Sequence, residues 1–305
     1  MPRILVTGAT GFIGQHLVAH LLATGREVSI LVREAYGMGQ PLPPALATQR
    51  SQLQVVYADL RNFALTARAV RQAAPEAVIH LAAAGVTDPF MAVETALRHN
   101  LTGTLNLLRA CFPGRGTPGH AVGQCIVGRT PGELVAMNPY AASKAAAWQF
   151  CQMYARTQAW PIHGAMIFQA YGPGQPAHTL VAAALAAALA GRDFPMTAGT
   201  QARDWIHVAD VAQGLAAFPG SDVAPGTTLD LGTGELTTLA DVVSQIYTLV
   251  GRGGQPRLGA LPSRPGEAPV QQANSRQTRQ LLHWQAVIPL ETGLKSMVET
   301  ACALE

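Results

Sequence analysis

The sequence predicts an α/β protein with a doubly wound parallel sheet and a smaller C-terminal lobe. Short apolar runs alternate with helical patterns as far as about residue 171, and a glycine-rich turn links the first run to the first helix. Beyond that point the alternation weakens into helices and long loops. With 305 residues, the chain is long enough to bury the core that such a fold requires.

The expected elements follow one another in regular order. Strands are expected at residues 4–6, 28–32, 53–57, 77–81, 121–127, 162–168 and 228–231. Helices are expected at residues 15–23, 65–73, 92–111 and 141–157. Because strands that alternate with helices form parallel sheets, we expect residues 1–171 to form one domain, to which residues 205–234 return. Residues 172–305 would mainly form the smaller lobe, over the carboxyl ends of the strands, where ligands of open α/β sheets bind.

The turn after the first strand has the spacing of a phosphate-binding loop. Gly8 allows the chain to reverse, Gly11 allows the backbone to approach a phosphate, and Gly14 allows the helix to lie close to its strand. The helix N-terminus offers free N–H groups and a positive dipole end to an anion. A tight turn that binds nothing is the alternative. We predict a Rossmann-type dinucleotide site that includes Thr7, Gly8, Thr10, Gly11, Phe12, Ile13 and Gly14.

The residues after the next strands predict which dinucleotide binds. Arg33 ends the second strand, where NAD sites favour an acid, and its guanidinium suits a 2′-phosphate; this predicts NADP(H). In the alternative, Arg33 is solvated, Glu34 binds the ribose hydroxyls and NAD(H) is the cofactor. Asp59, with Leu60, is placed to meet the adenine. The segment expected to pass beneath the cofactor consists of Leu81, Ala82 and Ala83.

Composition excludes several classes of function. The net charge of +3 is scattered without a basic cluster, so we expect neither nucleic acid nor a membrane surface as a partner. The four cysteines lack close spacing and are expected to be free thiols in a reducing compartment. The histidines show no metal-ligand spacing, and no metal is expected. The first residues do not form a signal peptide, and the longest apolar run, residues 180–190, is too short to cross a bilayer, so we expect a cytoplasmic protein.

Two residues near position 140 can carry chemistry. Asn138 is a good N-cap and Pro139 suits the first helical position, which places Tyr140 in the first turn and Lys144 one turn later on the same face. A free phenol, with a pKa near ~10, is a poor acid–base catalyst at neutral pH. A neighbouring ammonium and the helix N-terminus lower that pKa. The chain has only two lysines, which favours a special role for Lys144; an ordinary exposed pair is the alternative.

With these motifs the chain resembles the extended short-chain dehydrogenase/reductases, the group of nucleotide-sugar epimerases, dehydratases and ketoreductases. The resemblance covers nearly the full length. It is carried by Thr7-Gly-Ala-Thr-Gly-Phe-Ile-Gly14, Asp59-Leu60, His80-Leu-Ala-Ala, His99-Asn100-Leu-Thr-Gly-Thr, Pro139-Tyr-Ala-Ala-Ser-Lys144, Tyr171-Gly-Pro-Gly174, Arg203-Asp-Trp-Ile-His-Val-Ala-Asp-Val-Ala212, Leu231-Gly-Thr-Gly234 and Arg264-Pro-Gly-Glu267.

The resemblance implies roles for particular residues. Tyr140 would exchange a proton with a sugar hydroxyl or ketone while hydride moves to or from the nicotinamide. Lys144 would lower the pKa of Tyr140 and hold the nicotinamide ribose, and Asn100 would belong to the cofactor site. Arg203 and Arg264 match positions that grip a nucleotide diphosphate. Relatives often form homodimers through the helices expected at 92–111 and 141–157, and we expect the same here.

The pattern departs from the family beside the catalytic pair. Relatives usually carry Ser or Thr at the end of the fifth strand, and aligning Gly128 with the glycine that closes their segment places Gly123 there, followed by Gln124 and Cys125. Cys125, Thr130 or a water would then replace the missing hydroxyl. Dehydratases place an Asp-Glu pair after that residue, so Gln124-Cys125 disfavours dehydration. Gln169 stands where an asparagine is common, which leaves the sugar open; the substrate-binding residues expected are Gly123, Gln124, Cys125, Gln169, Arg203 and Arg264.

Three functions follow from these observations. The first is an NADPH-dependent reductase of a nucleotide-linked keto-sugar, which Arg33 favours. The second is a nucleotide-sugar epimerase with tightly bound NAD. The third, of another class, is a non-catalytic NAD(P)-binding sensor or scaffold, which Gly123 favours and the intact Tyr140 and Lys144 disfavour.

Overall fold

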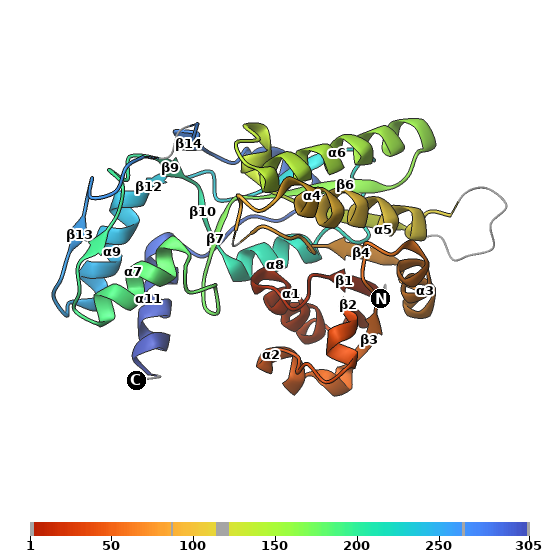
Figure 1. Cartoon of the computed structure of the whole chain (residues 1–305), viewed down its shortest axis with the longest axis horizontal. Helices are drawn as coiled ribbons and strands as arrows, with labels where there is room; N and C mark the ends of the chain where they lie inside the picture. The colour runs from red at the N-terminus through yellow and green to blue at the C-terminus, as the bar shows by residue number, and fades with distance from the viewer. Residues whose placement is uncertain (1–2, 87, 114–121, 264–265, 304–305) are drawn as a thin grey trace.

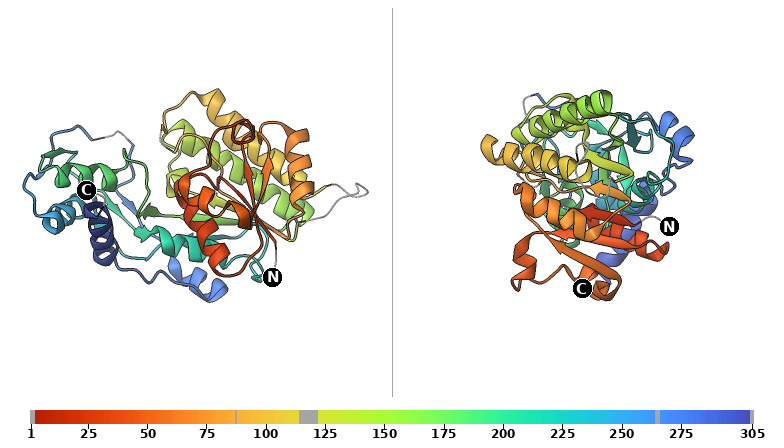
Figure 2. Two further views of the ribbon diagram at one scale, coloured as in Figure 1. Left: turned by 90° about the horizontal axis from the view of Figure 1, so that it is seen from below. Right: turned by 90° about the vertical axis from the view of Figure 1, so that its right-hand side faces the viewer.

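The computed structural model describes residues 3–86, 88–113, 122–263 and 266–303. The chain forms two lobes, a larger one built on a parallel sheet and a smaller C-terminal one beside it (Figure 1, Figure 2). The α/β class and the doubly wound sheet predicted from the sequence are confirmed.

The sheet of the larger lobe contains seven parallel strands in the order β11-β6-β5-β4-β1-β2-β3. The order reverses between β1 and β4, whose last residues Thr7 and His80 lie side by side. In open sheets of this kind, ligands bind in the crevice outside the carboxyl ends of the strands at the reversal point. The strands are β1 (Ile4–Thr7), β2 (Val28–Val32), β3 (Leu53–Tyr57), β4 (Ala77–His80), β5 (Gln124–Arg129), β6 (Ile162–Ile167) and β11 (Thr228–Leu231).

Helices cover both faces of the sheet, as the views from below and from the side show (Figure 2). Ile4 and Val6 pack on the face that carries Leu17 of α1, whereas Leu5 faces the opposite core with Leu107 of α5. This alternation is the period of two that a strand requires when both of its faces are buried. The helices and helical turns of this lobe are α1 (Phe12–Ala23), η1 (Glu34–Gly37), α2 (Pro44–Thr48), η2 (Arg50–Gln52), α3 (Phe63–Ala73), α4 (Val93–Ala96), η3 (Leu97–Thr102), α5 (Gly103–Cys111), η4 (Pro131–Leu134), α6 (Pro139–Gln158) and α8 (Val208–Ala216).

The helix expected at residues 92–111 is interrupted in its middle. Its central segment, η3, is a π-helical turn between α4 and α5. Asn100 lies in this turn, and its side chain is bonded to the backbone of Ala84 rather than facing solvent. Periodicity alone does not reveal such a turn, because it depends on a contact that is distant in the sequence.

The smaller lobe has its own core, in which Tyr171 and Trp205 pack against helices α7 (Leu180–Leu189), α9 (Leu239–Val250) and α11 (Leu290–Cys302). The remaining strands are very short. They are β7 (Gln169–Tyr171), β8 (Phe194–Pro195), β9 (Ala202–Arg203), β10 (Trp205–His207), β12 (Thr237–Thr238), β13 (Pro256–Arg257) and β14 (Val270–Gln271), and the last helix is α10 (Ser275–Leu282).

Two further expectations from the sequence concern membrane-spanning helices and the cysteines. Within the described residues, no helix is both long and apolar enough to span a bilayer. The four cysteines are free thiols; Cys111, Cys125 and Cys151 are buried, and Cys302 is exposed.

Candidate active site

The glycine turn fills the reversal point of the sheet at the end of β1. Gly8 has a φ of +73°, and a Cβ there would lie 2.6 Å from the backbone nitrogen of Ala82. A Cβ on Gly14 would collide with the carbonyl oxygen of Gly8. The turn is closed by a 3.0 Å bond from the Gly11 N–H to the same carbonyl. Glycine is therefore required at Gly8 and Gly14, by backbone conformation and by close approach.

The first turn of α1 has the free groups that an anion needs. The helix begins at Phe12 after Gly11, without a side-chain cap and without an acid in its first turn. Its first N–H groups therefore have no partner within the helix, and its dipole is not offset locally. Thr10, Phe12 and Ile13 lie around this turn, partly buried. These residues fit the pyrophosphate of a dinucleotide.

A buried polar network joins the end of β1 to the end of β4. The Thr104 hydroxyl donates to the carbonyl of Asn100 at 2.6 Å, so its oxygen accepts from Nε2 of His80 at 2.9 Å. Nδ1 of His80 then accepts from the Thr7 hydroxyl at 2.7 Å. Burial, with Lys144 nearby, lowers the pKa of His80 to about 3, so the ring is neutral. Thr7 thus contributes its side chain to the scaffold beneath the turn.

Asn100 connects the segment after β4 to α6. Its Oδ1 accepts from Ala84 N at 2.8 Å, and its Nδ2 donates to Ala84 O and to Oγ of Ser143, at 2.8 and 2.9 Å. The side chain is therefore fully engaged within the protein. Asn100 holds in place the neighbouring segment that the sequence assigned to the cofactor, namely Leu81, Ala82 and Ala83, each of them partly exposed.

The first turn of α6 holds Tyr140 as the sequence predicts. The Asn138 side chain accepts from Ala141 N at 2.8 Å, and Pro139 occupies the first turn. The Tyr140 N–H donates to the carbonyl of Pro89 at 3.2 Å. Gly85, which the sequence analysis did not single out, lies against the tyrosine: a Cβ there would stand 3.1 Å from the Cβ of Tyr140.

Lys144 is buried and points to the end of β5. Its Nζ donates to the carbonyl oxygen of Gly128 at 2.6 Å. Burial lowers the pKa of Lys144, and Glu133 opposes that effect. The sequence predicts a lowered pKa for Tyr140, whereas burial, with Glu133 as a second cause, raises the pKa of Tyr140 to about 12. The charge of a nearby lysine is visible in the sequence, whereas desolvation and the buried acid depend on the folded structure.

The assignment of Gly123, Gln124 and Cys125 to the substrate site is wrong. Gln124 pairs with Ala77, the first residue of β4, so all three lie at the amino edge of the sheet, away from the glycine turn. The Gln124 side chain bonds to the backbone of Ser221 and Gly220, and Cys125 is buried in the core. The alignment used Gly128 as a residue after the strand, whereas Gly128 lies within β5.

Thr130 is the residue that follows β5 at the carboxyl edge. It caps the short helix η4: its hydroxyl oxygen accepts from the Glu133 N–H, and its own N–H donates to Oε1 of Glu133 at 3.1 Å. Oε2 of Glu133 accepts from Nε of Arg129 at 2.9 Å. A Cβ on Gly132 would lie 3.7 Å from the Cβ of Ala141, so η4 packs beside the first turn of α6. The Thr-x-x-Glu spacing in the sequence is typical of a capping box and could have predicted this capped turn.

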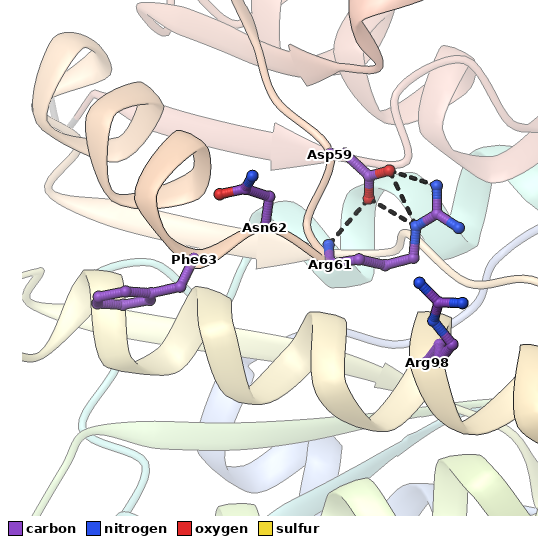
Figure 3. A pocket seen from close by; sticks show the side chains of 5 residues that line it. All are labelled: Asp59, Arg61, Asn62, Phe63 and Arg98. Carbon is purple, nitrogen blue, oxygen red and sulfur yellow. Dashed lines mark hydrogen bonds and ion pairs between the residues drawn. The ribbon is translucent and has the colours of Figure 1, made fainter.

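The expected adenosine end lies at the carboxyl ends of β2 and β3. Asp59 accepts from Arg61 through the backbone N–H and through the guanidinium, and this holds the pKa of Asp59 below its usual range (Figure 3). Leu60 is partly buried, and its carbonyl accepts from Nδ2 of Asn106 at 2.9 Å. Arg33 is exposed at the end of β2, directly before η1.

Of the two arginines expected to bind substrate, only Arg203 lies within the described residues. Arg203 is buried in β9 and forms a 2.9 Å ion pair with Glu267, so its charge is already offset within the chain. Arg264 lies outside the described residues. Gln169 is exposed at the start of β7, just beyond the end of β6. Within the described part of the chain, no group of three or more His, Cys, Asp or Glu side chains could hold a metal ion.

The fold agrees with comparisons to known proteins. A sequence profile of the NAD dependent epimerase/dehydratase family matches residues 4–228. UDP-glucose 4-epimerase of Mycolicibacterium smegmatis is 30% identical over 315 residues, covering 97% of each chain. A dTDP-glucose 4,6-dehydratase of Neisseria gonorrhoeae is 27% identical, covering 97% of this chain and 94% of that protein.

Solved structures have the same fold. UDP-glucose 4-epimerase of Thermotoga maritima with UDP-glucose aligns with a TM-score of 0.84 at 23% identity, over 99% of this chain and 100% of the other. The Thermus thermophilus UDP-glucose 4-epimerase complex with NAD aligns with a TM-score of 0.79 at 26% identity, over 97% and 98% of the two chains. The chain belongs to the NAD dependent epimerase/dehydratase family, a family of nucleotide-sugar enzymes.

Proposed function

We propose that this chain is a nucleotide-sugar 4-epimerase that acts on a UDP-hexose. The observation that carries the proposal is the placement of Tyr140, Lys144 and Thr130 at the carboxyl edge of the sheet. Lys144 bonds to Gly128, two residues before Thr130, and Tyr140 lies on the same helix one turn earlier. The carboxyl end of β4 lies beside the end of β5 on this edge, and on its other side it adjoins the glycine turn after β1.

Each of the three residues has a role that its contacts allow. The raised pKa of Tyr140 keeps the phenol protonated at neutral pH, so it can give a proton to a keto oxygen and must lose one to oxidise a hydroxyl. Thr130 already accepts a bond from Glu133 N, which leaves its own O–H free to donate to the same sugar oxygen. Lys144, one turn after Tyr140 on α6 and bonded to the carbonyl of Gly128, supplies positive charge at the same edge of the sheet. A bound nicotinamide dinucleotide supplies hydride transfer to and from the sugar carbon.

Dehydration is disfavoured by the residues that follow Thr130. The dehydratases of the family place an Asp-Glu pair there, whereas this chain has Pro131 and Gly132, which cannot transfer protons. The prediction against dehydration therefore rests on Pro131 and Gly132 instead of on Gln124 and Cys125. The 4-epimerases named among the relatives support epimerisation.

A second candidate is an NADPH-dependent reductase of a nucleotide-linked keto-sugar. Exposed Arg33 at the end of β2 favours it, because a reductase exchanges NADPH at each turnover whereas an epimerase retains its cofactor. The third function considered, a non-catalytic sensor, rested on the missing hydroxyl at Gly123. Because Gly123 lies at the opposite edge and Thr130 follows β5, that argument no longer applies.

The substrate assay separates these candidates. Purified protein is incubated with UDP-glucose, with and without added NAD, and the products are separated by chromatography. We expect conversion to UDP-galactose, without net production of reduced nicotinamide. Consumption of NADPH with a UDP-4-keto-hexose, without interconversion of the two hexoses, would instead support the reductase. Cofactor binding without turnover of either substrate would contradict both.

We also propose that the chain forms a homodimer through α4, η3 and α6. Val93, Leu97 and Phe150 are large apolar residues with 52%, 39% and 41% of their surface exposed. All three lie on the helices through which the family resemblance predicts dimers. Sedimentation of the intact chain tests this: a dimer that Phe150→Glu converts to a monomer supports it, and a monomeric parent protein contradicts it.

A further inference from the structure

Arg129 is the last residue of β5, and its side chain turns back between the sheet and α6. Its Nη1 donates to Oγ1 of Thr228 at 2.8 Å, and its guanidinium carbon lies 4.5 Å from the centre of the Trp148 ring. Thr228 pairs with Gly164, which in turn pairs with Val127, two residues before Arg129. The guanidinium therefore lies nearer the amino edge of the sheet than its own backbone, and it points away from the carboxyl edge where substrate is expected.

Gly164 of β6 provides the space for this side chain. A Cβ there would lie 2.9 Å from Cδ of Arg129, 2.9 Å from the Trp148 ring and 2.6 Å from Oγ1 of Thr228. These three side chains thus fill the volume that a side chain at residue 164 would occupy. The Arg129 side chain is 11% exposed. Because the sheet, α6 and a cation–π contact all hold it, the guanidinium is fixed in one orientation.

The fixed guanidinium holds Glu133 by one of its two carboxylate oxygens. Nε of Arg129 donates to Oε2 of Glu133 at 2.9 Å, and Oε1 accepts from the Thr130 N–H at 3.1 Å. The Glu133 side chain is 1% exposed, so solvent offers it almost no alternative partner. Because both oxygens are bonded, the ion pair sets the position of the carboxylate in the capping box. Without Arg129, an unpaired buried carboxylate would be costly and would leave that position.

The capping box connects Glu133 to the hydroxyl that is proposed to act on substrate. The Glu133 N–H donates to the Thr130 hydroxyl oxygen, which directs the remaining O–H of Thr130 away from η4. Movement of Glu133 would therefore disturb both bonds of the box and turn this hydroxyl. A displacement of about 1 Å is enough to cost up to about 10²-fold in rate when a group must meet a reacting atom.

We propose that Arg129 is a positioning residue of the proposed epimerase reaction, which holds the Thr130 hydroxyl in its donating orientation through Glu133. The guanidinium acts from behind the capping box, without contact to the substrate. The inference rests on the proposed function, in which Thr130 donates to the sugar oxygen. It assigns a role to a buried arginine that the local sequence does not reveal, since its partners Trp148 and Thr228 come from distant parts of the chain.

Kinetics with UDP-glucose in two backgrounds test the proposal. We expect Arg129→Met to lower kcat at least about tenfold and to leave KM within about twofold, because Arg129 does not touch substrate. Arg129→Lys keeps the charge and one of the two bonds and should recover part of the loss. In the Thr130→Val background, Arg129→Met should change kcat less than about twofold, since the hydroxyl that it positions is absent. Arg257→Met removes an exposed, ion-paired arginine of β13 and should leave kcat unchanged.

Amide hydrogen exchange measures the positioning without turnover. The N–H groups of Thr130 and Glu133 are the two backbone donors of the capping box. We expect both to exchange at least about tenfold faster in Arg129→Met than in the parent protein, and at unchanged rates in Arg257→Met. Thermal midpoints identify the variants that remain folded at the assay temperature. If Arg129→Met unfolds, Arg129→Lys keeps the buried charge and supplies the same comparisons with smaller expected effects.

The remaining outcomes separate this proposal from the proposed function. An equal loss of kcat with and without Thr130→Val would overturn the proposal, because Arg129 would then act on the fold as a whole. Unchanged exchange at Thr130 in Arg129→Met, or an unchanged kcat beside a reduced kcat in Thr130→Val, would also overturn it and leave the proposed function intact. No turnover by the parent protein, with faster exchange in Arg129→Met, would contradict the proposed function and support the coupling of Arg129 to Thr130.

Discussion

The Nζ of Lys144 donates a 2.6 Å hydrogen bond to the carbonyl oxygen of Gly128, and this bond connects helix α6, which carries Tyr140 and Lys144, to the end of β5. The lysine is buried, so its charge acts through a medium of low effective dielectric constant. Tyr140 and Thr130 are positioned by the two elements that this bond joins. The arrangement of all three depends on the length of the connection between β5 and α6.

Replacing Lys144 by methionine should abolish most of the activity without unfolding the protein. Methionine fills a similar volume, and removing one group that stabilises developing charge typically costs about 10²- to 10³-fold in rate. The measurement is kcat for the proposed epimerisation, together with the thermal midpoint. Lys295→Met is the matched control, since Lys295 is exposed and is the only other lysine. Comparable rates for both variants would contradict the role of Lys144.

Replacing Thr130 by valine should lower kcat by about 10²- to 10³-fold, the usual effect of removing one positioned donor to developing charge. Thr130→Ser keeps the hydroxyl and should retain most of the rate. Loss of the cap should also cost about 1 kcal/mol in stability, which an unfolding titration would measure. Gln124→Ala, at the opposite edge of the sheet, should leave kcat unchanged; a larger effect there than at Thr130 would reverse the assignment of the site.

Replacing Glu133 by glutamine should shift the pH dependence of activity to lower pH. Glu133 raises the pKa of Tyr140, so removing its charge lowers the pH at which the phenolate forms. The profile of kcat/KM against pH in the direction of alcohol oxidation measures this. Glu133→Asp keeps the charge and should shift the profile less. An unchanged profile in Glu133→Gln would show that Glu133 does not act on the titrating group.

His80 should make stability depend on pH between about 3 and 6.5. Because the folded pKa lies below the unfolded one, the unfolded chain binds more protons in this window. Stability is therefore fully present above pH 6.5 and is lost as the pH falls, by up to about 1.4 kcal/mol per unit. Urea titrations at several pH values should show a shallower slope for His80→Asn than for the parent protein. Parallel slopes would contradict a neutral buried His80.

Much of the fold could be predicted because it depends on local periodicity. The apolar runs at 28–32, 53–57 and 228–231 coincide with β2, β3 and β11, and the Asn138 cap places the start of α6. The two-residue strands of the smaller lobe could not be predicted, since their pairing depends on tertiary contacts. The π-helical turn around Asn100 depends on the distant backbone of Ala84 in the same way.

The position of a motif in the fold could be predicted where one segment carries all the necessary information. The glycine turn and the Tyr140–Lys144 spacing are local patterns, and both lie where the sequence placed them. The residue after β5 was misplaced because a glycine served as the alignment anchor and the strand extends past it to Arg129. The pKa of Tyr140 was misjudged because Glu133 and burial act through the folded structure.

Deuterium retention tests the central claim most directly. The protein is incubated with UDP-glucose that carries deuterium at C4 of the glucose, and the product is examined by nuclear magnetic resonance. We expect UDP-galactose that keeps its deuterium at C4, because the hydrogen removed from that carbon is returned to it, and we expect Tyr140→Phe to form product at least about 10²-fold more slowly. Loss of deuterium to solvent, or equal rates in the parent protein and Tyr140→Phe, would contradict oxidation and re-reduction at C4 with Tyr140 as the proton-transfer group.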